Sequence, residues 1–190
     1  MFTAFRSYVI APGFLLRPAT PDDADGLAVA YRRNREHLRP WEPFRDEAFF
    51  TTDGQTDRLR NLAELRRTGR AMPWLLVADE GQGDVVGVVN VTNVVQGPLL
   101  SATLGYWIAA DHTGKGLAPS AVTAVCRDAD EHLGLHRIEA GTVTSNTASQ
   151  RVLTKCGFEL IGKAPNYLHI HGAWRDHFLF QKILNDRVPD

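Results

Sequence analysis

The pattern of hydrophobic and polar positions alternates along the chain between a period of about two residues and a period of about 3.6. Runs rich in β-branched and aromatic residues indicate strands, and apolar residues spaced three and four apart indicate helices. The predicted strands cover 14–17, 73–78, 84–95, 101–109 and 136–143, followed by a final pair that starts at Gly157, turns near His171 and Gly172, and ends near Leu184. The predicted helices cover 21–34, 52–70, 118–133 and 146–156.

The order of these elements predicts a fold of the α/β (α+β) class. Strand 101–109, helix 118–133 and strand 136–143 form a strand-helix-strand unit, so the two strands should be parallel with a right-handed crossover. Strands 73–78 and 84–95 should form a hairpin around Glu80 to Gly83. We therefore expect one domain over 1–190, with a core from about 14 to 185 and a mixed central sheet flanked by about four helices.

Composition narrows the class of protein without identifying it. A chain of 190 residues can bury roughly 70% of its unfolded surface. With 44% hydrophobic residues, 23% charged residues and a net charge of -1, the chain shows no sign of disorder, of a membrane span or of the basic face that direct nucleic-acid binding requires. The two cysteines, Cys126 and Cys156, are expected to be buried thiols, and residues 1–13 lack a signal-peptide pattern, so we expect a cytoplasmic protein.

The stretch from Ser101 to Cys126 indicates an anion site. It reads as a strand, a turn with two glycines, and the start of a helix, an order that directs backbone N–H groups and the positive end of a helix dipole toward one point. A Walker loop would need Lys and Ser or Thr after the last glycine, where Leu117 and Ala118 stand. A dinucleotide fingerprint would need a third glycine where Pro119 stands.

Two segments together resemble the GCN5-related N-acetyltransferases. Thr113 to Ala118 matches their coenzyme A loop, Gln/Arg-x-x-Gly-x-Gly/Ala, at its fourth and sixth positions, and Thr113 departs from the Gln or Arg expected first. Asn146, Ser149 and the closing Gly157-Phe158 match a second signature of the family. The resemblance implies parallel strands that splay apart to bind acetyl-CoA. The implied donor-binding residues are Tyr106, Trp107, Ile108, Thr113, Gly114, Lys115, Gly116, Leu117, Ala118, Asn146 and Ser149.

Two further stretches resemble the ribosomal-protein-alanine N-acetyltransferase branch of that family. These are Leu38 to Glu47, with Trp41-Glu42-Pro43 at its centre, and Gly172 to His177. The resemblance implies acetyl-CoA as donor and, as acceptor, the N-terminal α-amine of a protein, in this branch a ribosomal protein starting with Ala or Ser. Trp41, Glu42 and Tyr167 are the candidate acceptor-binding residues.

Catalytic roles can be assigned to two residues. Ser149, which matches the family's serine, is the candidate acid for the departing thiolate. Some relatives use as the base a glutamate in the strand after Gly-Phe, but residues 165–170 contain no acid here, so Glu42, within an acidic patch formed with Asp46 and Glu47, is the candidate base. Alternative interpretations remain open for each residue. Asn146 could simply cap a helix beside a solvated Ser149, Glu42 could be a surface charge beside Arg39 or Arg45, and Trp41 with Phe44 could fill a core.

Other functions are also compatible with the sequence. The acceptor could be a small amine such as an antibiotic or polyamine, because a fold does not determine a substrate. The chain could also be a catalytically silent acyl-CoA-binding module. His169, His171 and His177 are conceivable metal ligands, but Gly172 places the first two at a hairpin tip with no nearby cysteine or acidic cluster, so we expect no metal site. The chain could act as a monomer or a homodimer.

Overall fold

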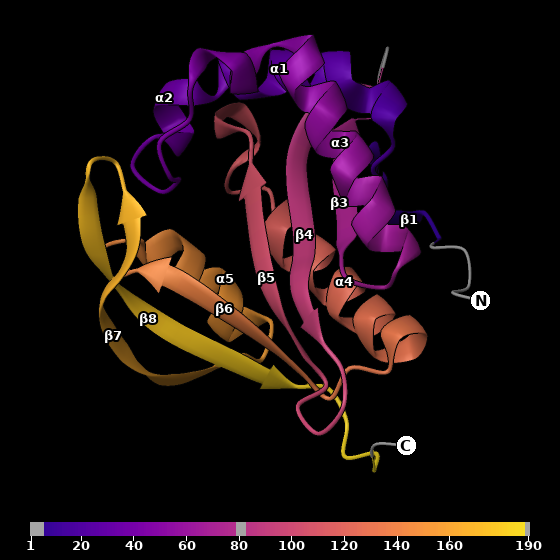
Figure 1. The fold of residues 1–190 in the computed structure, drawn as a ribbon, viewed down its shortest axis with the longest axis vertical. Helices are drawn as coiled ribbons and strands as arrows, with labels where there is room; N and C mark the ends of the chain where they lie inside the picture. The colour runs from indigo at the N-terminus through magenta and orange to yellow at the C-terminus, as the bar shows by residue number, and fades with distance from the viewer. Residues whose placement is uncertain (1–5, 79–82, 189–190) are drawn as a thin grey trace.

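A computed structural model describes residues 6–78 and 83–188 (Figure 1). The fold is one eight-stranded sheet in the order β1-β2-β3-β4-β5-β6-β8-β7. Its strands are β1 Tyr8–Ala11, β2 Phe14–Pro18, β3 Met72–Ala78, β4 Val85–Val95, β5 Ser101–Ile108, β6 Arg137–Val143, β7 Glu159–Ile170 and β8 Ala173–Ile183. The α-helices are α1 Ala24–Arg33, α2 Arg35–Leu38, α3 Thr52–Arg67, α4 Leu117–Leu133 and α5 Thr147–Lys155, and the 3-10 turns are η1 Pro21–Asp23, η2 Glu47–Phe50 and η3 Ala110–His112.

The predicted α/β class and mixed sheet are confirmed, with three local corrections. The helix expected over 21–34 begins as the 3-10 turn η1, and a separate short helix, α2, follows α1. The cap of α3 is Thr51, whose side chain accepts a hydrogen bond from the Gly54 N–H, rather than Thr52 or Asp53. β1 was not predicted, and it pairs with β2 at the edge of the sheet. Most of the turn expected at Glu80 to Gly83, and residues 1–5 of the N-terminal segment, lie outside the described residues.

The core lies on both faces of the sheet. Met72 to Val77 in β3 are all buried, and because successive side chains of a strand point to opposite faces, both faces of β3 must be covered. α3 packs on α1 and β3, and α4 packs on β1, β4 and β5. Cys126 in α4 and Cys156 after α5 are buried and free, as predicted. Within the described residues no helix is long and apolar enough to cross a membrane.

The two parallel strands separate early. β5 pairs with β6 only from Ser101 to Thr103, opposite Arg137 to Glu139. β5 continues to pair with β4 as far as Ile108, whereas β6 turns away and pairs with β8 along its whole length. The two strands therefore form a V that opens toward α2 and the tip of the β7–β8 hairpin (Figure 1). The splayed strands implied by the family resemblance are present.

β7 is the other edge of the sheet. It contains Leu160 and Ile161, which are both more than half exposed. The pairing of β7 with β8 shifts register twice, between Leu160 and Gly162 and between Ala164 and Leu168. Asn166, inside the second shift, has a positive φ of 48°. β7 is therefore an irregular edge strand.

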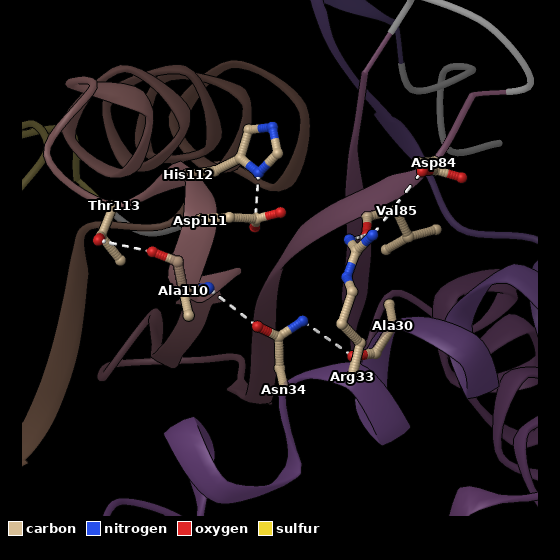
Figure 2. A network of polar contacts seen from close by, with 9 residues as sticks. All are labelled: Ala30, Arg33, Asn34, Asp84, Val85, Ala110, Asp111, His112 and Thr113. Atoms are coloured by element: carbon tan, nitrogen blue, oxygen red, sulfur yellow. Dashed lines mark hydrogen bonds and ion pairs between the residues drawn. The ribbon is translucent and has the colours of Figure 1, made fainter.

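A buried asparagine fixes the end of β5 relative to α1 (Figure 2). Asn34 follows α1, and its side chain is 2% exposed. Its Nδ2 donates to the carbonyl oxygen of Ala30 at 2.9 Å, and its Oδ1 accepts from the backbone N–H of Ala110 at 2.9 Å. Nearby, Arg33 donates to the carbonyl oxygen of Val85 and lies 3.8 Å from a carboxylate oxygen of Asp84. The segment that leads into α2 is thus tied to the turn that follows β5.

We expect Asn34→Ala to lower the free energy of unfolding by about 1–3 kcal/mol, because the Ala110 N–H would lose its acceptor. Urea unfolding followed by circular dichroism measures this change. Asn61→Ala, on the exposed side of α3, is the matched control and should change stability by less than about 0.5 kcal/mol. Equal effects of the two substitutions would contradict a tethering role for Asn34.

Candidate functional site

One cavity of about 790 Å³ occupies the V between β5 and β6. Its walls come from α1, the segment after α2, β5, the glycine loop, β6, the start of α5 and the β7–β8 hairpin. The cavity brings together most of the predicted site residues, namely Trp41, Glu42, Tyr106, Trp107, Ile108, Thr113, Gly114, Gly116, Leu117, Ala118, Asn146 and Ser149. Lys115 and Tyr167 are the two predicted residues that do not line it.

The glycine loop has the geometry of an anion site. Gly114 and Gly116 both have φ of 77°, a left-handed conformation that residues with a Cβ rarely adopt. Gly116 is the N-cap of the 17-residue helix α4, whose first N–H groups have no intrahelical acceptor. A Cβ at either glycine would meet no atom within 4 Å, so the loop is open on that side. These donors and the helix dipole favour a phosphate group.

Thr113 stabilises the loop instead of reaching out of it. Its hydroxyl donates to the carbonyl oxygen of Ala110 at 2.9 Å, so the side chain folds back onto η3 (Figure 2). The Gln or Arg expected at this position would be long enough to extend toward a ligand. Lys115 is exposed. In this chain the loop therefore offers mainly backbone donors.

The backbone of β5 beyond Thr103 is available on the side that faces the cavity. β4 occupies the opposite side of β5 as far as Ile108, and β6 pairs with none of the residues after Thr103. The Trp107 side chain has a separate role, because its Nε1 donates to the Tyr31 hydroxyl at 3.1 Å and the two rings lie 5.1 Å apart. An extended ligand could therefore form hydrogen bonds with the backbone of β5 beyond Thr103, where β6 no longer pairs with it.

Tyr106 and Ser149 meet across the cavity. The Tyr106 hydroxyl lies 2.8 Å from Ser149 Oγ and 3.2 Å from the Ser149 carbonyl oxygen. Asn146 caps α5, since its Oδ1 accepts from the Ser149 N–H at 3.1 Å. The capping interpretation of Asn146 is confirmed, whereas the interpretation of Ser149 as simply solvated is wrong. Burial raises the pKa of Tyr106 to about 12, although its hydrogen bond with Ser149 acts in the opposite direction.

Glu42 also lines the cavity. Its side chain is 23% exposed, and its carboxylate is 3.7 Å from Arg45 Nε. Burial raises the pKa of Glu42 above the ordinary 4.5, while Arg45 and Arg58 act in the opposite direction. The alternative interpretation is correct about the neighbour, Arg45, but Glu42 is mostly buried and lines the cavity rather than standing on the open surface. A carboxylate with a raised pKa that faces a cavity is well placed to act as a base.

The rest of the 38–47 segment differs from expectation. Phe44 is 80% exposed and does not fill a core, whereas Trp41 is partly buried and lines the cavity. Asp46 caps η2 by accepting from the Phe49 N–H, and Glu47 pairs with Arg35 at 2.5 Å. Neither carboxylate lines the cavity, so the predicted acidic patch reduces to Glu42.

The hairpin side contains a buried histidine that was not among the predicted site residues. His177 is 2% exposed and lines the cavity, and its Nδ1 lies 2.9 Å from the Arg175 carbonyl oxygen. Because a carbonyl can only accept, Nδ1 carries the hydrogen of this bond. Tyr167 packs on His177 with ring centroids 5.3 Å apart, outside the cavity lining. The described residues contain no group of three or more His, Cys, Asp or Glu arranged to hold a metal ion.

Sequence reasoning missed several other lining side chains. Tyr31 and Arg58 line the cavity, as does Tyr106, of which only the backbone was predicted to matter. Arg58 stands on α3, 16 residues beyond Glu42. No local motif identifies it, because the Tyr31 and Phe49 rings near its guanidinium come from other elements.

Comparison with known proteins now defines the class. The family model described as an acetyltransferase (GNAT) domain matches residues 14–159. The chain therefore belongs to the GNAT family and is an N-acetyltransferase, which confirms the resemblance of the coenzyme A loop and the second signature.

Among individual relatives, the ribosomal protein uS5-alanine N-acetyltransferase of Escherichia coli (strain K12) is 39% identical over 167 residues, which cover 88% of this chain and 86% of that protein. The crystal structure of ribosomal-protein-S5-alanine acetyltransferase from Vibrio fischeri matches with a TM-score of 0.93 and 34% identity, over 97% of this chain and 100% of that one. RimJ of Mycobacterium smegmatis, solved in complex with CoA-disulfide, matches with a TM-score of 0.84 and 34% identity, over 90% of this chain and 81% of that one.

Proposed function

We propose that this enzyme transfers the acetyl group of acetyl-CoA to the N-terminal α-amine of a protein, a ribosomal protein that starts with alanine or serine. The observation that carries the proposal is the single cavity that joins the glycine loop to Glu42 through the gap between β5 and β6. The similarity to enzymes named for ribosomal protein alanine acetylation supports the choice of acceptor. Such an enzyme would act in the cytoplasm, as a monomer or a homodimer.

The donor would lie along the glycine loop and β5. The N–H groups at the start of α4 would bind the pyrophosphate of acetyl-CoA, and the free edge of β5 would pair with the amide groups of its pantetheine arm. This placement would bring the thioester to the Tyr106–Ser149 pair, where the strands have separated. Backbone N–H groups of Tyr106 to Ile108 that point into the gap would polarise the thioester carbonyl.

The acceptor would enter from the 38–47 segment. At pH 7, about 10% of an α-amine with a pKa near 8 is neutral, against less than about 0.1% of a lysine with a pKa near 10.4. An α-amine therefore needs only modest help from a base. The Glu42 carboxylate, directly or through a water, would collect the proton as nitrogen attacks the carbonyl carbon.

The first test concerns donor binding. We expect Gly116→Val to abolish acetyl-CoA binding measured by calorimetry, because the new side chain projects into the open side of the loop where the phosphates would lie. Gly97→Val is the matched control, since Gly97 has a similar φ of 74°, also meets no atom within 4 Å, and lies outside the cavity. Both variants should lose similar stability, but only Gly116→Val should lose binding. Retained binding would disprove the loop assignment.

The second test concerns the base. We expect Glu42→Gln to lower kcat/KM for the acceptor by about 10²-fold near neutral pH, the lower end of the range for a lost general base. A protonated carboxyl cannot act as a base, so the wild type should lose its higher kcat/KM as the pH falls through the pKa of Glu42. Because that pKa is raised, the loss should occur at a pH above 4.5. Glu36→Gln, in α2 and paired with Arg39, is the control and should leave the pH–rate profile unchanged. If Glu42→Gln still lowered kcat/KM by about 10²-fold at low pH, where Glu42 is protonated, Glu42 would be excluded as the base.

The third test concerns the acceptor. Acetyl-CoA turnover should be measured against peptides with N-terminal alanine or serine, against N-blocked peptides with an internal lysine, and against small amines. We expect mass spectrometry to locate the acetyl group on the α-amine of the first class, with small first residues preferred over bulky ones. Turnover only with small amines would overturn the protein acceptor, and binding of acetyl-CoA without any turnover would indicate a silent module.

A further inference from the structure

The contact between Tyr106 and Ser149 bridges the two elements that border the site of chemistry. Tyr106 stands on β5 three residues beyond the last pairing with β6, and Ser149 stands in the first turn of α5. Both residues line the cavity. Each hydroxyl has one hydrogen to donate, so the arrangement of those two hydrogens determines whether a hydrogen-bond donor points into the cavity.

Two arrangements are compatible with the distances. In the first, Tyr106 donates to the Ser149 carbonyl oxygen at 3.2 Å and accepts the Ser149 hydrogen at 2.8 Å, which leaves no hydrogen for a ligand. In the second, Tyr106 donates to Ser149 Oγ at 2.8 Å, and the Ser149 hydrogen is free to point into the cavity. Both arrangements use the 2.8 Å contact, and they differ in which hydroxyl donates along it. A negative charge in the cavity would favour the second arrangement, because each hydroxyl would then donate in the direction of the charge.

Resting on the proposed function, we propose that Tyr106 is a positioning residue: it donates its hydrogen to Ser149 Oγ, so that the Ser149 hydroxyl donates to the departing sulfur of coenzyme A. In this pair neither hydroxyl gives up its proton. The bond between carbon and sulfur breaks, its electron pair goes to sulfur, and the new bond forms between the acceptor nitrogen and the acetyl carbon. The proton released by the nitrogen goes to Glu42 or water, and the thiolate later takes a proton from solvent.

The relative acidities support hydrogen bonding over proton transfer. A thiol has a pKa near 8.5. Burial raises the pKa of Tyr106 to about 12, so complete transfer from Tyr106 to the thiolate would be unfavourable by about 10³-fold. A donated hydrogen bond stabilises the developing charge on sulfur without that cost. This modifies the sequence-based prediction that Ser149 acts as a proton-donating acid.

A double-mutant cycle tests the proposal. We expect Ser149→Ala to lower kcat by about 10²-fold and Tyr106→Phe by about 10-fold, each with little change in the KM for acetyl-CoA. Because Tyr106 acts through Ser149, the double variant should be no slower than Ser149→Ala alone. Additive losses, or an unchanged kcat in Tyr106→Phe, would overturn the proposal. Tyr106→Phe removes only the hydroxyl, and urea unfolding of each variant would identify any loss of folded protein.

The dependence of kcat on pH separates positioning from proton donation. If Tyr106 only donates a hydrogen bond, the profiles of the wild type and Tyr106→Phe should be parallel from pH 7 to 10. A fall in wild-type kcat below pH 10 that is absent from Tyr106→Phe would show that Tyr106 titrates in this range, which contradicts a pKa of about 12, and would overturn the proposal. The cycle is measured with whichever amine the acceptor panel identifies. If the proposed acceptor class is wrong, the identity of the acetylated product will show it. If the proposed role of Tyr106 is wrong, the kcat values of the double-mutant cycle will show it.

Discussion

The separation of β5 from β6 after three paired residues is the constraint on which the rest of the structure depends. A parallel pair that stays together leaves no free backbone between its strands, whereas this pair exposes the inner edge of β5 while β4 still holds its outer edge. β6 does not lose its partners, because β8 pairs with it along its whole length. The sheet therefore stays continuous on both sides of the gap, because each strand that borders it keeps a partner on its other side.

Several polar contacts hold elements at the borders of this gap. Asn34 ties the end of α1 to the turn after β5, Trp107 is bonded to Tyr31 on α1, and Tyr106 reaches Ser149 on α5. Each of these bonds starts from β5 or from the residues just after it. The position of one strand thus sets the distances between the glycine loop, the start of α5 and the segment that carries Glu42.

The sequence predicted the elements whose causes are local. Gly134 ends α4 in the left-handed conformation, as the pattern indicated, and Gly114 and Gly116 form the turn before it. The links between distant parts of the chain could not be read in this way. Asn34 and Ala110 are 76 residues apart, and Tyr106 and Ser149 are 43 apart, so no local spacing connects them. The burial of Glu42 was missed for the same reason, since it depends on how the segment folds over β5 and α3.

The irregular edge strand β7 has a consequence for how the protein behaves at high concentration. An edge strand of 12 residues with exposed Leu160 and Ile161 could pair with the same strand of another molecule. The two register shifts and the positive φ of Asn166 interrupt the straight row of hydrogen-bonding groups that such pairing requires. The bulges of β7 thereby protect the open edge of the sheet against the edge-to-edge aggregation that a regular strand with the same side chains would invite.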